Sequence, residues 1–365
     1  MVIKSIFSMK LKSYLLLHIL RRQILKNKLQ QHFPMIRTQE EILTEIKDNE
    51  KLRNTYYKWC EEEQQEFLDF CTGVRGIKML YDSFSKEILN PELYPERLNE
   101  LLSLLLNQSV RIVSVLPNDS IRIADENSLI ITDIVVELED GSIANVEIQK
   151  IGYNFPGQRS ACYSADLLLR QYKRIKSREK KKFSYKDINT VFTIILFEKS
   201  TKEFYKFPDV YIHYFEQRSD SGLQINLLQK YIFISLDIFK KIHQNNSINN
   251  KLDAWLAFLC MDDPEKILSI VEKFPEFEQM YEQAYDICRN IEEVMGMFSK
   301  ELYELDKNTV QYMIDEMQEE LTKEREKNKR VQEELTKERD ENKKQKEELQ
   351  KKLSELEEKL KRNNV

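Results

Sequence analysis

Two acidic residues stand in apolar stretches of this chain at a spacing that could serve a metal. Asp133 lies within residues 129–138, and Glu147 follows fourteen positions later within residues 143–149. Both stretches are rich in Val and Ile and are separated by turn residues, which predicts two consecutive strands. An ionised carboxylate in so apolar a strand needs a partner or a metal ion.

The turn between these strands decides whether the two acids meet. A three-residue loop at 139–141, with Gly141 in the left-handed position of a bulge, sets Asp133 directly opposite Glu147. Directly opposed residues share a face, with Cβ atoms about 4.5–5.5 Å apart. A two-residue turn at 140–141 is the competing choice, and it would put the acids on opposite faces.

Opposed carboxylates repel each other unless a proton or a divalent cation lies between them. Oxygen ligands without histidine or thiolate suit Mg²⁺ or Mn²⁺, and a water activated by such an ion can attack a phosphodiester. The alternative is that both acids are ordinary polar residues on a solvated sheet face. The five cysteines and four histidines are dispersed, so we expect no zinc site or disulfide framework, and a reducing cytoplasm suits the thiols.

The elements around the two acids follow an α/β order. Thr38 and Glu41 have the spacing of a capping box, which predicts a helix start. We expect helices at 38–73, 77–89, 95–106, 157–177 and 251–305, and strands at 110–116, 129–138, 143–149, 190–197 and 230–236, with a weaker strand at 210–215.

These stretches resemble the PD-(D/E)XK nuclease superfamily, and in particular its transposase-like branch of recombination-promoting nucleases. The resemblance is carried by residues 78–84, 110–119, 130–141, 145–150, 155–164 and 169–172. It implies a restriction-endonuclease-like α/β core, a mixed central sheet flanked by helices. N-terminal helices, a C-terminal helical region and a coiled coil would surround that core.

The resemblance also implies roles for individual residues. Asp133 and Glu147 would hold Mg²⁺ (or Mn²⁺), and Gln149 would orient the attacking water where the superfamily usually has a lysine. Asp82 matches an early acidic position of the branch, although a solvent-facing helix residue is an equal alternative. On the helix after the sheet, Arg159 would contact DNA. Tyr163 and Gln171, eight residues apart on that helix, would support the site, or Tyr163 would simply pack against the sheet.

A strongly basic segment, 173–186, follows that helix, with eight basic residues and a single acidic one. Such a segment could neutralise a phosphate backbone beside the site, or be a solvated loop. For DNA contact we select Lys173, Arg174, Lys176, Arg178, Lys180, Lys181 and Lys182.

The two ends of the chain differ from the centre. Residues 1–36 hold seven Lys and Arg and no acidic residue, which suggests a loosely ordered basic extension, with the compact part beginning at Met35; a DNA- or surface-binding arm is the alternative. Its apolar stretch is too short to span a bilayer. Near the other end, Leu321, Leu335 and Leu349 repeat every two heptads, which predicts a coiled coil; a solitary charged helix is the alternative.

We therefore expect five segments: a basic extension at 1–36, helices at 37–75, a nuclease-like domain at 76–245, a helical region at 246–308 and a coiled coil at 309–362. The expected function is that of a cytoplasmic, Mg²⁺-dependent DNA endonuclease of a mobile-element or recombination-promoting type. It would be a homodimer joined through the coiled coil and would not bind membranes. The alternative is a catalytically weak nuclease-fold module that binds DNA or another partner.

Overall fold

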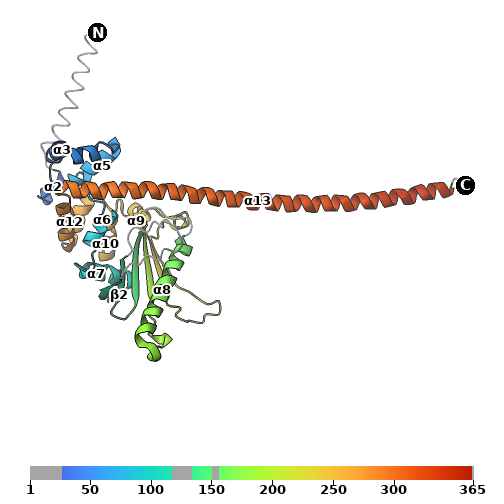
Figure 1. The fold of residues 1–365 in the computed structure, drawn as a ribbon, viewed down its shortest axis with the longest axis horizontal. Coiled ribbons are helices and arrows are strands. Elements are labelled where there is room, and N and C mark those ends of the chain that lie inside the picture. Colours follow the sequence, from blue (N-terminus) through green and yellow to red (C-terminus); the bar gives the residue numbers. More distant parts are fainter. Residues whose placement is uncertain (1–26, 117–133, 150–155, 364–365) are drawn as a thin grey trace, which may run out of the picture. The chain divides into compact units, whose positions relative to one another are not determined.

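The computed structural model describes residues 27–116, 134–149 and 156–363 (Figure 1). The chain divides into two compact units, Met1–Asn308 and Thr309–Val365.

The first unit is built on a six-stranded sheet. Its strands, in the order in which they pair, are β1 (Ile112–Val115), β2 (Ile134–Leu138), β3 (Ile143–Gln149), β4 (Val191–Phe197), β6 (Gln229–Ser235) and β5 (Ile212–Phe215). β3, β4 and β6 run parallel, and the remaining pairs are antiparallel. The predicted mixed sheet is confirmed, and the weakest predicted strand, at 210–215, forms one edge.

The turn between β2 and β3 has the predicted three-residue form. Ile134 lies opposite Val146, and the backbone N–H of Leu138 donates to the carbonyl of Ser142 at 2.8 Å. Gly141 has a φ of +81°, a left-handed value that glycine adopts without steric cost. The two-residue alternative is excluded, because it would shift the register by one residue and exchange the two faces of a strand.

The described part of the chain also forms helices. They are α2 (Lys28–His32), α3 (Gln39–Asp48), α4 (Glu50–Tyr56), α5 (Glu61–Cys71), α6 (Asp82–Ile88), α7 (Pro95–Leu106), α8 (Pro156–Glu179), α9 (Leu236–His243), α10 (Lys251–Cys260), α11 (Pro264–Lys273), α12 (Glu276–Ile287) and α13 (Ile291–Asn363). The single helix expected over 38–73 is instead three helices, because Asn49 and Cys60 act as N-caps within it. No described helix is both long and apolar enough to cross a membrane.

The even-numbered side chains of β3 enter the main hydrophobic core. Ala144, Val146 and Ile148 pack there with residues of β4 and β6 and with helices that lie before and after the sheet in sequence. This core is continuous from Leu29 to Phe298. The expected segments 37–75, 76–245 and 246–308 therefore share one core.

The odd-numbered side chains of β3 face α8 instead. Leu167 of α8 clusters with Val135, Ile143 and Val191, and Figure 1 shows α8 lying along the sheet. Ile143 is the first residue of β3, whereas α8 begins seven residues after β3 ends. The helix therefore runs back along β3, so that its first turns lie near the end of the strand.

The compact part of the chain begins earlier than Met35, the position that the sequence alone suggested. Leu29 and Phe33 are fully buried, and the ring of Phe33 packs 5.3 Å from that of Tyr285. Leu29 and Phe33 are four positions apart, so they share one face of the short helix α2 and its continuation. Residues 28–33 thus belong to the compact part of the chain.

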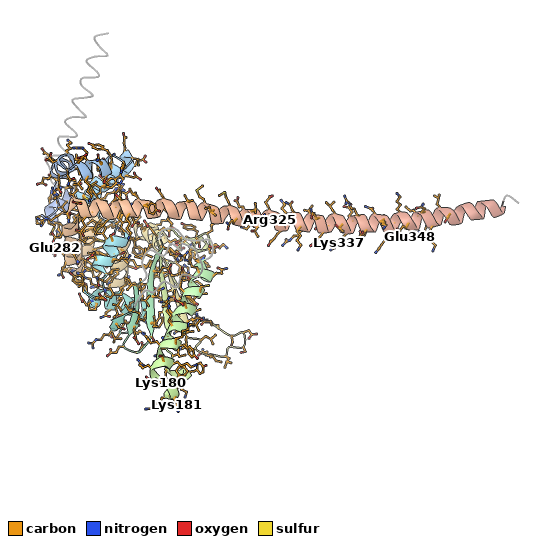
Figure 2. The ribbon with its side chains drawn as sticks, in the orientation of Figure 1. Lys180, Lys181, Glu282, Arg325, Lys337 and Glu348 are labelled. Atoms are coloured by element: carbon orange, nitrogen blue, oxygen red, sulfur yellow. The ribbon has the colours of Figure 1, made fainter. Side chains whose placement is uncertain are left out.

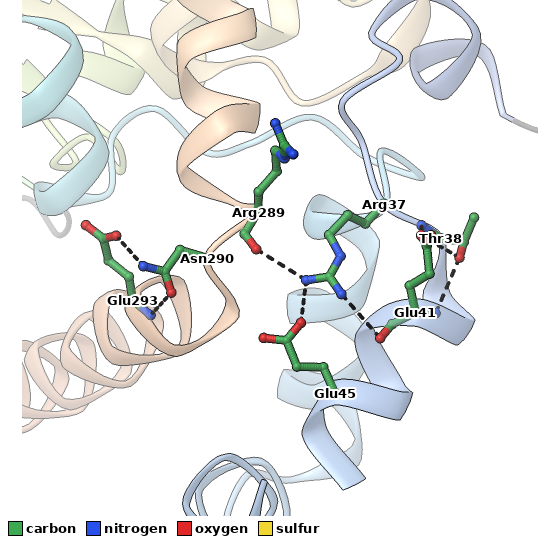
Figure 3. A network of polar contacts seen from close by, with 7 residues as sticks. All are labelled: Arg37, Thr38, Glu41, Glu45, Arg289, Asn290 and Glu293. Carbon is green, nitrogen blue, oxygen red and sulfur yellow. Dashed lines mark hydrogen bonds and ion pairs between the residues drawn. The ribbon is translucent and has the colours of Figure 1, made fainter. Parts of the chain in front are cut away.

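The predicted capping box at the start of α3 is confirmed. The carboxylate of Glu41 accepts the N–H of Thr38 at 2.8 Å, and the hydroxyl of Thr38 accepts the N–H of Glu41 at 3.3 Å (Figure 3). Arg37 beside it forms an ion pair with Glu45 at 2.6 Å and donates to the carbonyl of Arg289 at 3.2 Å. These contacts tie α3 to the turn between α12 and α13.

The second unit consists of the continuation of α13. The whole helix contains 73 residues. Leu321, Leu335 and Leu349 are exposed on it, by 52%, 49% and 65%. The helix is confirmed, and the coiled coil stays a prediction.

Replacing Gly141 with Ala should lower the free energy of unfolding by about 1–2 kcal/mol, the cost of a left-handed conformation for a residue with a Cβ. An added Cβ would also meet the side-chain amide of Asn189 at 2.4 Å. The matched control is Gly296→Ala in α13, where the site is exposed and a Cβ meets nothing within 4 Å. That change should stabilise the helix by up to about 1 kcal/mol. Equal effects of the two variants in urea unfolding would contradict this account of the turn.

Candidate functional site

One face of β3 carries a row of buried polar side chains. Asn145, Glu147 and Gln149 occupy alternate positions and are 3%, 0% and 3% exposed. Alternation puts all three on the face covered by α8, whereas the residues between them enter the apolar core. A buried carboxylate between two buried amides is the most polar feature of the sheet.

The two carboxylate oxygens of Glu147 differ in their surroundings. Oε1 accepts a hydrogen bond from Nε2 of Gln149 at 2.8 Å. Oε2 is buried and has no hydrogen-bond partner among the described residues, and the same holds for Oε1 of Gln149. Burial raises the pKa of Glu147, and the Gln149 hydrogen bond and the charge of Arg159 oppose this rise. The carboxyl therefore favours a proton or a nearby cation.

The other two predicted acids are Asp133 and Asp82. Asp133 lies outside the described residues, directly before β2 in the sequence. Asp82 is the first residue of α6, and its side chain likewise lies outside the described part of the structure.

The first turns of α8 lie close to Glu147. Arg159 is half-buried, acts electrostatically on the Glu147 carboxyl, and its guanidinium carbon is 5.5 Å from the centre of the Tyr163 ring. Tyr163 is also half-buried. The structure thus brings Arg159 and Tyr163 together at the end of β3 that carries Glu147.

Three buried polar residues in this layer did not emerge from the sequence. Ser164 of α8 and Thr193 of β4 are both 0% exposed, and neither hydroxyl has a partner among the described residues. Asn145 pairs with Thr193 across β3 and β4, and its side-chain carbonyl is likewise unpartnered there. For Thr193 the available signal was a lone polar residue in an otherwise apolar strand. For Asn145 it was the position two residues before Glu147, which puts both side chains on one face of the strand.

Gln171 does not lie beside Glu147, although both face the same side of the sheet. Its side-chain carbonyl accepts the backbone N–H of Asn189 at 2.6 Å. Glu147 lies opposite Ile195 of β4, which comes six residues after Asn189. Six residues of strand span about 20 Å. Gln171 and Tyr163 share one face of the helix, as their spacing predicts. Eight residues of helix nevertheless separate the two side chains by about 12 Å along the helix axis. Gln171 therefore anchors the segment that leads into β4.

The basic segment also lies far from Glu147. Because α8 continues as one helix to Glu179, about 30 Å of helix separate its first turns from the lysines at 180–182. Figure 2 shows Lys180 and Lys181 at the far end of α8. The expectation that this segment lies beside the carboxylates was wrong.

Two of the selected basic residues have acidic partners. Arg174 pairs with Glu137 of β2 at 3.2 Å, and Nε of Arg178 lies 2.9 Å from a carboxylate oxygen of Glu179. Lys173, Lys176 and Lys180–Lys182 are exposed. The lysines are therefore the better candidates for contact with phosphates.

Replacing Glu147 with Gln should raise the melting temperature in metal-free buffer at pH 7. Because burial raises the pKa of Glu147, the wild type loses stability as the pH rises above about 4.3, the ordinary value of the carboxyl. Each kcal/mol by which the variant increases the free energy of unfolding should raise the melting temperature by about 2–4 °C. The difference between the two proteins should close as the pH falls toward 4.3. A variant that melts below the wild type at pH 7 would contradict this reading.

Comparison with known families gives the site its context. Residues 82–313 match the model of the PD-(D/E)XK nuclease family transposases, and this range contains the whole sheet, α8 and Glu147. Comparisons with curated proteins and with solved structures found no match. Because the family model covers more than half of the sequence, the chain belongs to the PD-(D/E)XK nuclease family transposases.

Proposed function

We propose that this chain is a DNA endonuclease of a mobile-element or recombination-promoting type that depends on a divalent cation, Mg²⁺ or Mn²⁺. The observation that carries the proposal is the fully buried Glu147 carboxyl, whose Oε2 has no protein partner among the described residues. Buried polar atoms are nearly always satisfied, so an open carboxylate oxygen fits a cation ligand. The family supports nuclease chemistry on DNA.

Asp133 would supply the second carboxylate. If the pairing of Ile134 with Val146 continued by one residue, Asp133 would lie opposite Glu147. Val135, two positions after Asp133, faces α8, which is also the face of Glu147. Among the described residues no three His, Cys, Asp or Glu side chains form a metal-binding group. The proposed site combines Glu147 with Asp133.

The neighbours of Glu147 suit phosphodiester hydrolysis. A divalent cation held by Asp133 and Glu147 would offset phosphate charge and lower the pKa of a water molecule. Gln149 fixes one Glu147 oxygen through Nε2, which leaves its own Oε1 to accept a hydrogen bond from the attacking water. Arg159 brings positive charge to the same end of β3.

A second candidate function is a catalytically weak nuclease-fold module that binds DNA or another partner. The observation in its favour is Gln149, which stands where a lysine is usual in the superfamily. An amide adds no positive charge to a transition state, and here one of its two N–H groups already donates to Glu147.

Cleavage of supercoiled plasmid by the purified full chain distinguishes the two functions. The wild type should cut in Mg²⁺ or Mn²⁺ and should not cut in EDTA. Glu147→Ala should reduce the rate by more than about 100-fold, because losing a ligand costs more than losing a residue that only orients one. Glu139→Ala, an exposed acid in the adjacent turn, should cut like the wild type. Absent wild-type cleavage, or cleavage that survives Glu147→Ala, would favour the module.

We further propose a cytoplasmic homodimer joined by a coiled coil of α13. The exposed leucines recur every fourteen residues, and a second copy could bury them. Five free cysteines fit a reducing compartment.

Sedimentation equilibrium tests the dimer. Changing Leu321, Leu335 and Leu349 together to Asn should convert a dimer to a monomer, because the apolar seam is lost. The matched control changes the following residues, Thr322, Thr336 and Gln350, to Asn and should leave the dimer intact. A wild type that sediments as a monomer would refute the proposal.

A further inference from the structure

The far end of α8 carries a cluster of three aromatic rings. Tyr172 and Tyr185 stack nearly parallel, with centroids 6.1 Å apart and planes inclined by 12°. Phe183 meets both rings edge-on, at 5.4 and 5.3 Å. Tyr185 is 74% exposed, so this cluster presents a large aromatic surface to solvent.

The segment that bears the cluster is held in place by hydrogen bonds. The N–H of Ser184 donates to Asp187 at 2.8 Å, and the Ser184 hydroxyl accepts the N–H of Lys186 at 3.3 Å. Two residues after Asp187, the backbone N–H of Asn189 donates to the buried side chain of Gln171. The exposed ring of Tyr185 is therefore preorganised, which lowers the entropy cost of binding a ligand to it.

Lysines surround the rings. Nζ of Lys176 lies 2.6 Å from the Tyr172 hydroxyl and 5.0 Å from the centre of that ring. This hydrogen bond raises the pKa of Lys176. Lys180, Lys181 and Lys182 are exposed nearby in sequence.

Exposed rings among cations suit a particular form of nucleic acid. Phosphate neutralisation requires lysines but no aromatic surface, and a duplex hides the faces of its bases. An unpaired strand offers both phosphates and base faces, and base faces stack on exposed aromatic side chains.

We propose that Tyr172, Phe183, Tyr185 and the lysines at 176 and 180–182 form a platform that stacks unpaired bases of DNA. This rests on the proposed function, because it names the substrate class of the same nuclease: DNA with a single-stranded segment. About 20 Å of helix separate Tyr172 from Arg159 in the first turns of α8, which corresponds to about six nucleotides at 3.4 Å each. The substrate would therefore extend at least that far from the unpaired bases to the scissile phosphate.

Affinities measured in EDTA with the full chain test the platform without cleavage. The probes are a labelled single strand of about 20 nucleotides, long enough for this span, the matching duplex, and a single-stranded RNA of the same sequence. Tyr185→Ala should weaken single-strand binding about tenfold or more, as expected for one stacked base, and change duplex binding less than twofold. Tyr185→Phe should bind like the wild type. Lys181→Ala should weaken binding to both DNA forms and reduce its salt dependence.

Tyr57→Ala is the matched control, because Tyr57 is also an exposed tyrosine (60%) that contacts another ring, that of Tyr56. It should leave both affinities unchanged. Equal losses on single strand and duplex, no loss in Tyr185→Ala, or a loss in Tyr185→Phe would overturn the platform. A preference of more than tenfold for RNA would overturn its assignment to DNA.

The outcome is separable from that of the proposed function. If the wild type cuts plasmid DNA and Tyr185→Ala has no selective effect, only the platform fails. If the wild type does not cut plasmid DNA and Tyr185→Ala still loses single-strand binding selectively, the platform is retained and the nuclease is refuted.

Discussion

The burial of one carboxyl group, that of Glu147, constrains the arrangement around it. A charge removed from water needs a proton, a cation or donors, and here one oxygen has Gln149 while the other is open among the described residues. The strand that carries Glu147 is fixed from its other end, where the left-handed Gly141 sets the hairpin register. A change of one residue in this register would turn β2 over and remove its side chains from the face of Glu147.

The long helix α8 connects two regions with different chemistry. Its first turns bring Arg159 and Tyr163 to the buried carboxyl. The aromatic rings gather at Tyr172, about 20 Å further along the helix, and the lysines at 180–182 follow its last turn, about 30 Å away. Gln171 lies between these regions and holds the segment before β4. Charge and aromatic surface are thus separated from the carboxyl by a rigid element, which suits a substrate as extended as a nucleic acid strand.

Features set by local chemistry could be predicted from the sequence. β3, the three-residue turn before it and the capping box at Thr38 agree with the structure because each depends on residues a few positions apart. Features set by distant contacts could not be predicted. The pairing of Arg174 with Glu137 joins a helix to a strand 37 positions earlier, and the burial of Leu29 depends on a core that reaches Phe298. Sequence proximity also misled for the basic segment, since an unbroken helix converts a few turns into tens of ångströms.

A divalent cation held jointly by Glu147 and Asp133 can be detected by electron paramagnetic resonance of Mn²⁺ added to the metal-free protein. We predict that the wild-type protein binds Mn²⁺, that Glu147→Gln and Asp133→Asn each weaken this binding strongly, and that Glu139→Gln in the exposed turn leaves it unchanged. Wild-type protein that leaves Mn²⁺ free in solution, or binding that survives both substitutions, would contradict the account.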